Sequence, residues 1–188
     1  LSWDLIKRLT APRGERAVRR IFGGMLVSRF ERVAAAGVLA ALGAAEGRAH
    51  LVERIGKKAI DRPLAMELAG ELHMVEAQQR LEAAAADRRD ALRGTALRAL
   101  ASLGAPGALE RCTAALADEA EDPDVRCDAA EGLLLLGTPE AEAALLRARD
   151  EAKDERIRRV VQVCLSLQGK PAREIRLYLP LSGDEVAG

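Results

Sequence analysis

Few residues in this chain of 188 have the types and spacing that catalysis or metal binding needs. It contains two histidines, His50 and His73, and a metal site would need more ligands at suitable spacing. Three cysteines, Cys112, Cys127 and Cys164, lack CxxC spacing and stand among Ala and Leu at helical positions. This pattern predicts small buried thiols and a reducing compartment. We therefore expect no metal and no cofactor.

Nucleophile and nucleotide motifs are also missing from the sequence. It has no GxSxG, no P-loop and no Rossmann glycine pattern, and the pair Gly23-Gly24 alone says little about phosphate binding. An acidic run at 119–124 is typical of a solvated loop that leads into a helix cap. The sequence predicts no catalytic residue, and we expect that the protein is not an enzyme.

Arginine recurs with a period, at the start of a twelve-residue frame that ends in glycine. A function confined to one site would not repeat in this way, so we interpret these arginines as structural, with stems packed between layers and heads paired with caps or carbonyls. The spacings between frames are 31, 30, 33 and 32 residues, and the second and fifth copies are degraded. The five frames are RVAAAGVLAALG (32–43), PLAMELAGELHM (63–74), RGTALRALASLG (93–104), RCDAAEGLLLLG (126–137) and RRVVQVCLSLQG (158–169).

Each frame has the periodicity of a helix that packs through one face. In the fourth copy Ala129, Ala130, Leu133 and Leu136 share a face, with small side chains first and large ones last. The closing glycines sit where a helix ends in a left-handed residue. Residues of N-cap type, namely Ser28, Asp122 and Asp154, precede three of the frames. A period of this size predicts stacked helical repeats.

The segment DPDVRCDAAEGLLLLGTPEAEAALLRAR (122–149) resembles the short HEAT-like repeat first described in phycobilisome lyases. Ordinary HEAT repeats have a period of about 40–47 residues, and the periods of tetratricopeptide and ankyrin repeats are closer to the spacing found here. However, the Trp/Tyr signature of tetratricopeptide repeats and the TPLH signature of ankyrin repeats are absent. The resemblance implies an all-α fold, a right-handed α-solenoid of about five stacked helix pairs. By analogy with the family, the second helices would line the concave side.

We divide the chain into an N-terminal helical cap (1–27), the repeats (28–169) and a short extended C-terminal tail or linker (170–188). Within the cap we expect one helix over 2–10 and another over 15–28, whose apolar face includes Met25 and Leu26. The predicted repeats span 28–58, 61–86, 89–120, 122–152 and 154–169.

Composition supports helices and bounds the possible partners. Aromatic residues make up 2% of the chain, fewer than a β-sandwich or barrel normally uses, and no apolar run is long enough for a membrane span. Residues 1–62 hold 13 Lys/Arg and 6 Asp/Glu, whereas residues 63–188 hold 16 and 23. Such asymmetry affects association rather than fold, and it allows head-to-tail self-association.

These observations favour a non-enzymatic scaffold or adaptor that binds protein partners in the cytoplasm, since stacked helix pairs form an extended binding surface. The basic N-terminal end would contact an acidic partner. One alternative, which the resemblance implies, is a subunit of a chromophore (bilin) lyase. Another is binding of nucleic acid or an anionic surface through the basic N-terminal third, although stacking aromatics are few. The candidate partner-binding residues lie on predicted second helices: Arg48, Arg54, Lys57, Glu110, Arg111, Glu142 and Arg149.

Overall fold

The computed structural model describes residues 12–170 and 175, and this part of the chain is entirely helical. It contains ten α-helices and one short 3-10 helix, η1. In chain order they are α2 (Pro12–Gly23), α3 (Arg29–Ala41), α4 (Ala45–Ile55), α5 (Arg62–Glu71), η1 (Val75–Ala77), α6 (Gln78–Ala86), α7 (Arg93–Leu103), α8 (Ala108–Ala117), α9 (Pro123–Leu136), α10 (Pro139–Glu151) and α11 (Glu155–Leu167).

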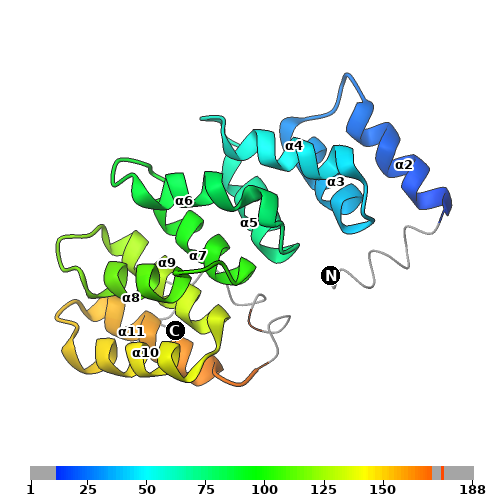
Figure 1. The fold of residues 1–188 in the computed structure, drawn as a ribbon. Helices are drawn as coiled ribbons and strands as arrows, with labels where there is room; N and C mark the ends of the chain where they lie inside the picture. The colour runs from blue at the N-terminus through cyan, green and yellow to red at the C-terminus, as the bar shows by residue number, and fades with distance from the viewer. Residues whose placement is uncertain (1–11, 171–174, 176–188) are drawn as a thin grey trace.

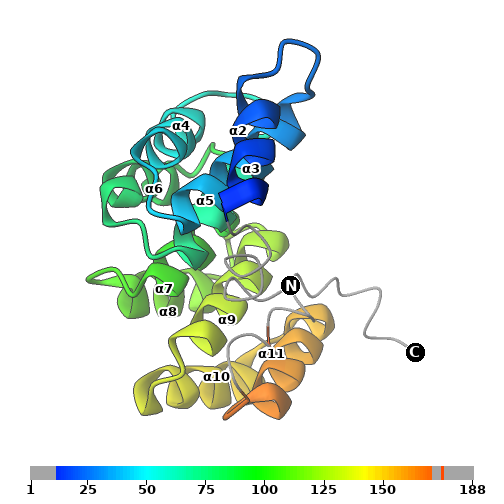
Figure 2. The same cartoon turned by 90° about the vertical axis from the view of Figure 1, so that its right-hand side faces the viewer.

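The helices form two layers that follow one curved stack (Figure 1). The first helices of the repeats are α3, α5, α7, α9 and α11, and each packs against the next in the series. The second helices, α4, α6, α8 and α10, form the other layer, and each also contacts the first helix of the following repeat. Figure 2 separates α4, α6 and α10 from α3, α9 and α11. The predicted α-solenoid is confirmed.

The first helices pack more closely than the second helices, because glycines let their backbones approach. A Cβ on Gly70 would stand 2.8 Å from the carbonyl oxygen of Ala99 in the next first helix. A Cβ on Gly132 would stand 3.3 Å from the Cβ of Ala101. In a curved stack the closer layer is the inner one, so the first helices lie on the concave side (Figure 2). The expectation that the second helices line that side is therefore wrong.

Leucines of successive repeats make one continuous core between the two layers. A leucine with no more than 2% of its surface exposed comes from nearly every helix of the stack, as expected for a repeat that cannot bury its apolar face alone. These leucines are Leu39, Leu51, Leu81, Leu97, Leu100, Leu116, Leu133, Leu134 and Leu145.

The helix ends follow the predicted signals. Ser28 forms a capping box with Glu31, and the side chains of Asp122 and Asp154 accept hydrogen bonds from the first turns of α9 and α11. The closing glycines of four frames have positive φ, a conformation that a side chain disfavours. They are Gly43, Gly104, Gly137 and Gly169, with φ between 61° and 84°.

In the second repeat the frame begins one residue earlier than the sequence pattern suggested. His73 occupies the closing position with a φ of 49°. Among the residues that the structure describes, it is the single non-glycine residue with a positive φ. Arg62 then stands at the first position, where the sequence analysis placed Pro63. The second repeat therefore keeps its arginine and replaces only the closing glycine.

The N-terminal cap packs on α3, but its helix has different bounds from those expected. Helix α2 ends at Gly23, so Met25 and Leu26 lie in the connection and are fully exposed, at 95% and 102%. Two consecutive glycines favour a helix end at this place. At the other end of the chain, Ile175 is 5% exposed and belongs to the core. The expected helix over 2–10 and most of the expected extended tail lie outside the described residues.

Candidate interaction face

The recurring arginines connect each first helix to the helix before it in the chain. All five donate a side-chain hydrogen bond to a carbonyl oxygen near or just beyond the end of the preceding helix, where the carbonyls lack helical partners. This confirms the structural interpretation of their heads. The bonds are Arg32 to Gly24, Arg62 to Ile55, Arg93 to Ala85, Arg126 to Leu116 and Arg158 to Ala152.

Two of these arginines also reach forward to an acid in the next repeat. The guanidinium of Arg62 binds both carboxylate oxygens of Asp90, at 2.8 and 2.7 Å. Arg93 donates from Nη1 to one carboxylate oxygen of Glu121, which is also twenty-eight residues further on. A paired, part-buried bridge between repeats fixes their relative positions more firmly than a single surface ion pair.

The seven candidate residues all lie in or just after the second helices, but they differ in how free they are. Glu110 and Glu142 are exposed and form no salt bridge within the described chain. Lys57 is also exposed, and its Nζ lies 3.9 Å from the carboxylate of Glu53. Arg48 forms a two-pronged pair with Glu76, and Arg111 donates to the carbonyl oxygen of Pro106. Arg149 pairs with its neighbour Asp150.

Arg54 does not point outward as the sequence analysis expected. Its Nη2 lies 2.5 Å from the carboxylate of Asp61, a residue that is only 1% exposed. Burial raises the pKa of the Asp61 carboxyl, but the hydrogen bond from the Arg54 guanidinium and its positive charge lower it more. The pKa of Asp61 therefore stays below its usual value. Arg54 is therefore part of the fold and a poor candidate for contact with a partner.

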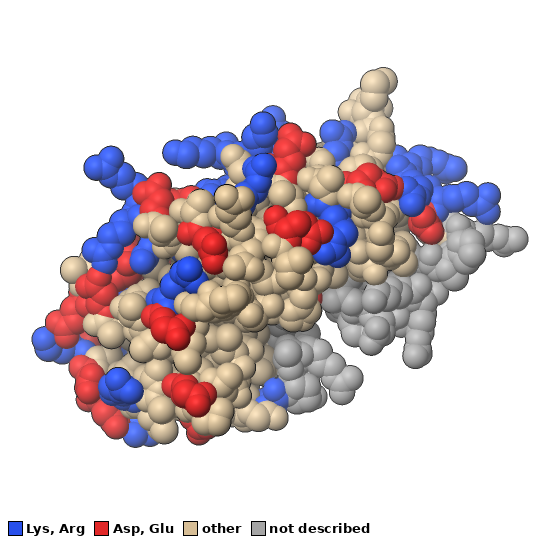
Figure 3. Space-filling view, viewed as in Figure 1, with Lys and Arg blue, Asp and Glu red and all other residues tan. Residues whose placement is uncertain are grey.

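Grooves open between successive second helices, because this outer layer is spread apart. One lies between α4 and α6 and includes Arg48 and Glu76. The next lies between α6 and α8 and includes Arg93 and Arg111. The third lies between α8 and α10 and includes Arg126 and Arg147. Figure 3 looks onto this face, where charges of both signs alternate along the second helices.

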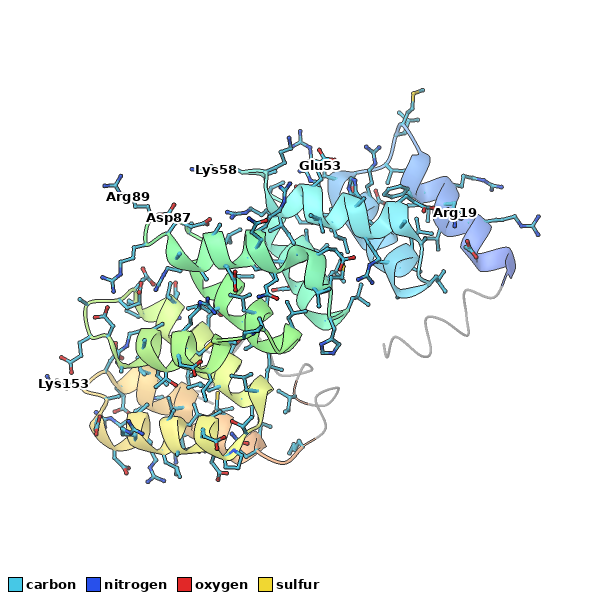
Figure 4. The ribbon with its side chains drawn as sticks, in the orientation of Figure 1. Arg19, Glu53, Lys58, Asp87, Arg89 and Lys153 are labelled. Atoms are coloured by element: carbon cyan, nitrogen blue, oxygen red, sulfur yellow. The ribbon has the colours of Figure 1, made fainter. Side chains whose placement is uncertain are left out.

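Cations also project at the edge where second helices connect to the next repeat. Figure 4 shows Lys58, Arg89 and Lys153 pointing away from the stack at this edge. Lys153 pairs with Glu119 across the connections. Within the part of the chain that the structure describes, neither Lys58 nor Arg89 lies within salt-bridge distance of an acid. This edge adds positive charge to the rim of the second-helix face.

The first-helix face contains an ion cluster that the sequence analysis missed. Arg98 on α7 lies 2.9 Å from Glu67 on α5, 2.8 Å from Asp128 on α9 and 2.5 Å from Glu131 on α9. Glu131 is 1% exposed and Arg98 is also buried. One guanidinium therefore holds three carboxylates from both neighbouring repeats.

The cluster shifts the pKa of its acids upward. Burial raises the pKa of Asp128 to about 7, with Arg98 opposing the shift and Glu131 and Glu67 adding to it. Burial also raises the pKa of Glu67. Three carboxylates around one cation cannot all ionise without repulsion, so one of them tends to keep its proton.

The residues first examined for chemistry are integrated into the fold. Cys112, Cys127 and Cys164 are buried, and burial raises the pKa of Cys112 to about 12 and that of Cys127 to about 11. His50 contacts Phe22 edge to face, with ring centroids 5.2 Å apart. Within residues 12–170 no cluster of His, Cys, Asp and Glu is arranged to hold a metal ion. None of the helices described could cross a membrane.

Comparison with known proteins supports the repeat assignment. Residues 77–166, from the start of α6 into α11, match the family model of HEAT repeats. This match is to HEAT repeats in general and does not distinguish the phycobilisome-lyase type. A search of curated proteins gave no significant match. The helical stack of α6 to α11 is therefore similar to HEAT repeats, which agrees with the α-solenoid that the whole described chain forms.

Proposed function

We propose that the protein is a non-enzymatic cytoplasmic scaffold that binds a protein partner on its second-helix face. The observation that carries this proposal is the row of grooves between successive second helices. Arg48, Arg111 and Arg147 line these grooves. The exposed Lys57, Glu110 and Glu142 lie in or just after the same helices, and charged side chains on a binding face give specificity and steer association. HEAT repeats generally mediate protein–protein interaction, and a solenoid offers an extended surface for it.

The first-helix face is the weaker candidate. Its central charges, Arg98 with Glu67, Asp128 and Glu131, already satisfy one another within the chain. A partner that broke this cluster would leave buried charges without compensation, which is costly. In the groove between α4 and α6 the pair of Arg48 with Glu76 is exposed, so contact there does not require a buried charge cluster to break.

Charge reversal on the second-helix face tests the proposal. The partner is first identified by co-purification from the native host and then purified. We expect Lys57→Glu combined with Glu142→Lys to weaken its binding by about tenfold or more in calorimetry, equivalent to about 1.4 kcal/mol. Arg54 is left intact because it supports the fold.

The matched control reverses an exposed charge on the first-helix layer, Arg159→Glu on α11. This variant should bind the partner as the wild type does. Loss of binding in the control, together with full binding in the second-helix variant, would contradict the proposal.

A second candidate function is attachment to an anionic surface through the N-terminal cap. The fully exposed Met25 and Leu26 project from the turn between α2 and α3, and Arg16, Arg20 and Arg29 lie nearby in the sequence and are exposed. Apolar side chains beside cations are the combination that binds the interface of an anionic membrane.

Vesicle flotation tests this candidate. The protein should float with vesicles that contain phosphatidylserine and should not float with purely zwitterionic vesicles, since each basic residue near the surface adds electrostatic attraction. Met25→Ser combined with Leu26→Ser should reduce the floated fraction several-fold. Equal flotation of this variant and the wild type would exclude the turn as the attachment point.

A further inference from the structure

The groove between α8 and α10 has a buried cation at its floor. It has a volume of about 120 Å³, which suits the end of a side chain rather than a folded element. Thr113 and Leu116 line it from α8, and Ala144, Arg147 and Ala148 line it from α10. Arg126 on α9 forms the floor and is 7% exposed.

The guanidinium of Arg126 is only partly satisfied. Its Nε donates to the carbonyl oxygen of Leu116 at 3.0 Å. Within the described residues its two terminal nitrogens have no carboxylate partner. Asp118 senses the charge of Arg126, but its own carboxylate is held by Arg88 and by the backbone N–H of Ala120.

The equivalent arginines of the two preceding repeats are satisfied by acids. Arg62 binds Asp90 and Arg93 binds Glu121, each twenty-eight residues further on. The residue at the same distance from Arg126 is Asp154, and its carboxylate instead caps α11 by accepting from the backbone N–H groups of Arg156 and Ile157. The fourth repeat therefore has the arginine without the acid that binds it in the second and third repeats.

We propose that this groove binds a carboxylate of the partner protein, an Asp or Glu side chain or a chain terminus, on the guanidinium of Arg126. The two free nitrogens match the two oxygens of a carboxylate in the fork geometry that Arg62 and Asp90 already show. The inference uses the proposed function only to name a protein as the source of the carboxylate.

The charges around the groove favour a carboxylate over a phosphate. Arg126 and Arg147 are balanced by Glu119 and Glu151 among the lining residues. A single negative charge can bind beside those two acids, whereas a phosphate near its dianionic form meets more repulsion. The apolar wall of Leu116, Ala144 and Ala148 suits the methylene groups of an acidic side chain.

The experiment follows the Nε–Hε NMR signal of Arg126 while small ligands are added to the intact protein. Propionate represents an acidic side chain and N-acetylglycine represents a chain terminus. We expect either one to shift the signal saturably in the millimolar range, and propionamide to leave it unchanged. Equal shifts with propionate and propionamide, or tighter binding of inorganic phosphate than of propionate, would overturn the proposal.

Two variants sharpen the result. Arg126→Lys keeps the charge but loses the fork, so propionate affinity, followed by chemical shifts of the groove backbone, should fall by about tenfold. Arg111→Lys in the neighbouring groove is the matched control and should bind propionate like the wild type. If Arg126→Lys does not fold, Ala148→Glu takes its place. Its own carboxylate should occupy Arg126 and abolish the response, and an unchanged response would overturn the proposal.

These ligands are small, so the outcome is independent of any protein partner. A saturable response at Arg126 with no effect of the second-helix charge reversal on partner binding would keep the site and reject the proposed face. No saturable response at Arg126, together with weaker partner binding after the charge reversal, would support the proposed binding face and reject the carboxylate site.

Discussion

Replacement of Arg98 by Met should lower the free energy of unfolding by about 3–5 kcal/mol, among the largest losses expected for a single substitution in this chain. Arg98 lies within 2.9 Å of carboxylate oxygens of Glu67, Asp128 and Glu131. Its removal takes away the guanidinium that lies 2.5 Å from the carboxylate of Glu131, which is 1% exposed. Urea denaturation at neutral pH measures the loss.

The matched control is Arg149→Met, since Arg149 is exposed and pairs only with its neighbour Asp150. It should leave the denaturation midpoint nearly unchanged. The double variant Arg98→Met, Glu131→Gln should recover part of the loss, because one buried charge then disappears with its partner. A loss for Arg98→Met no greater than that of the control would show that the cluster does not stabilise the stack.

The ionisation of Asp128 should contribute a loss of stability as the pH rises from about 4 to about 7. The pKa of Asp128 in the folded protein is about 7, compared with an ordinary value of 3.8. Between these values the folded state holds a proton that the unfolded state has released, so each unit of pH removes up to about 1.4 kcal/mol. The total over this window is about 4 kcal/mol at most.

The difference between wild type and Asp128→Asn isolates this contribution from other titrating groups. We expect the variant to gain stability relative to the wild type as the pH is raised from 5 to 8, because an amide cannot ionise. Asp150→Asn is the control, since Asp150 is exposed and its pKa is lowered by Arg149. If the difference in the free energy of unfolding between wild type and Asp128→Asn stays constant with pH, the raised pKa of Asp128 is contradicted.

The repeat architecture could be predicted from the sequence because its signals are local. Apolar residues at helical spacing, the capping residues Ser28, Asp122 and Asp154, and the closing glycines each specify a helix or its end without long-range information. The second copy is degraded, so its frame was placed one residue too late in the sequence. Pro63 was matched to the frame arginine, although Arg62 makes the same type of contact as the other frame arginines and His73 takes the left-handed position of the glycine.

The cluster around Arg98 was missed because its members come from three repeats. With the second frame corrected, Glu67, Arg98 and Glu131 occupy the same frame position in successive repeats. Charged residues of alternating sign at one position of a frame that otherwise consists mainly of Ala and Leu could have predicted this cluster. The first position, the Ala and Leu positions and the closing glycine keep one residue type from frame to frame, whereas this position changes its charge and was therefore overlooked.

The direction of curvature and the state of individual charges also needed the structure. Close backbone approach at Gly70 and Gly132 places the first helices on the inner side, which a family analogy misassigned. Arg54 was predicted to be free because its helical position is outward, yet Asp61 in the following connection captures it. Arg126 was predicted to be like its equivalents, and only the engagement of Asp154 in a cap distinguishes it.

Hydrogen–deuterium exchange of the protein with and without its purified partner tests most directly that the second-helix layer is the binding face. If the second helices form this face, partner binding should slow exchange in α4, α6, α8 and α10 and leave α5, α7 and α9 unchanged. Slower exchange confined to α5, α7 and α9 would contradict it and would place the partner on the concave first-helix face.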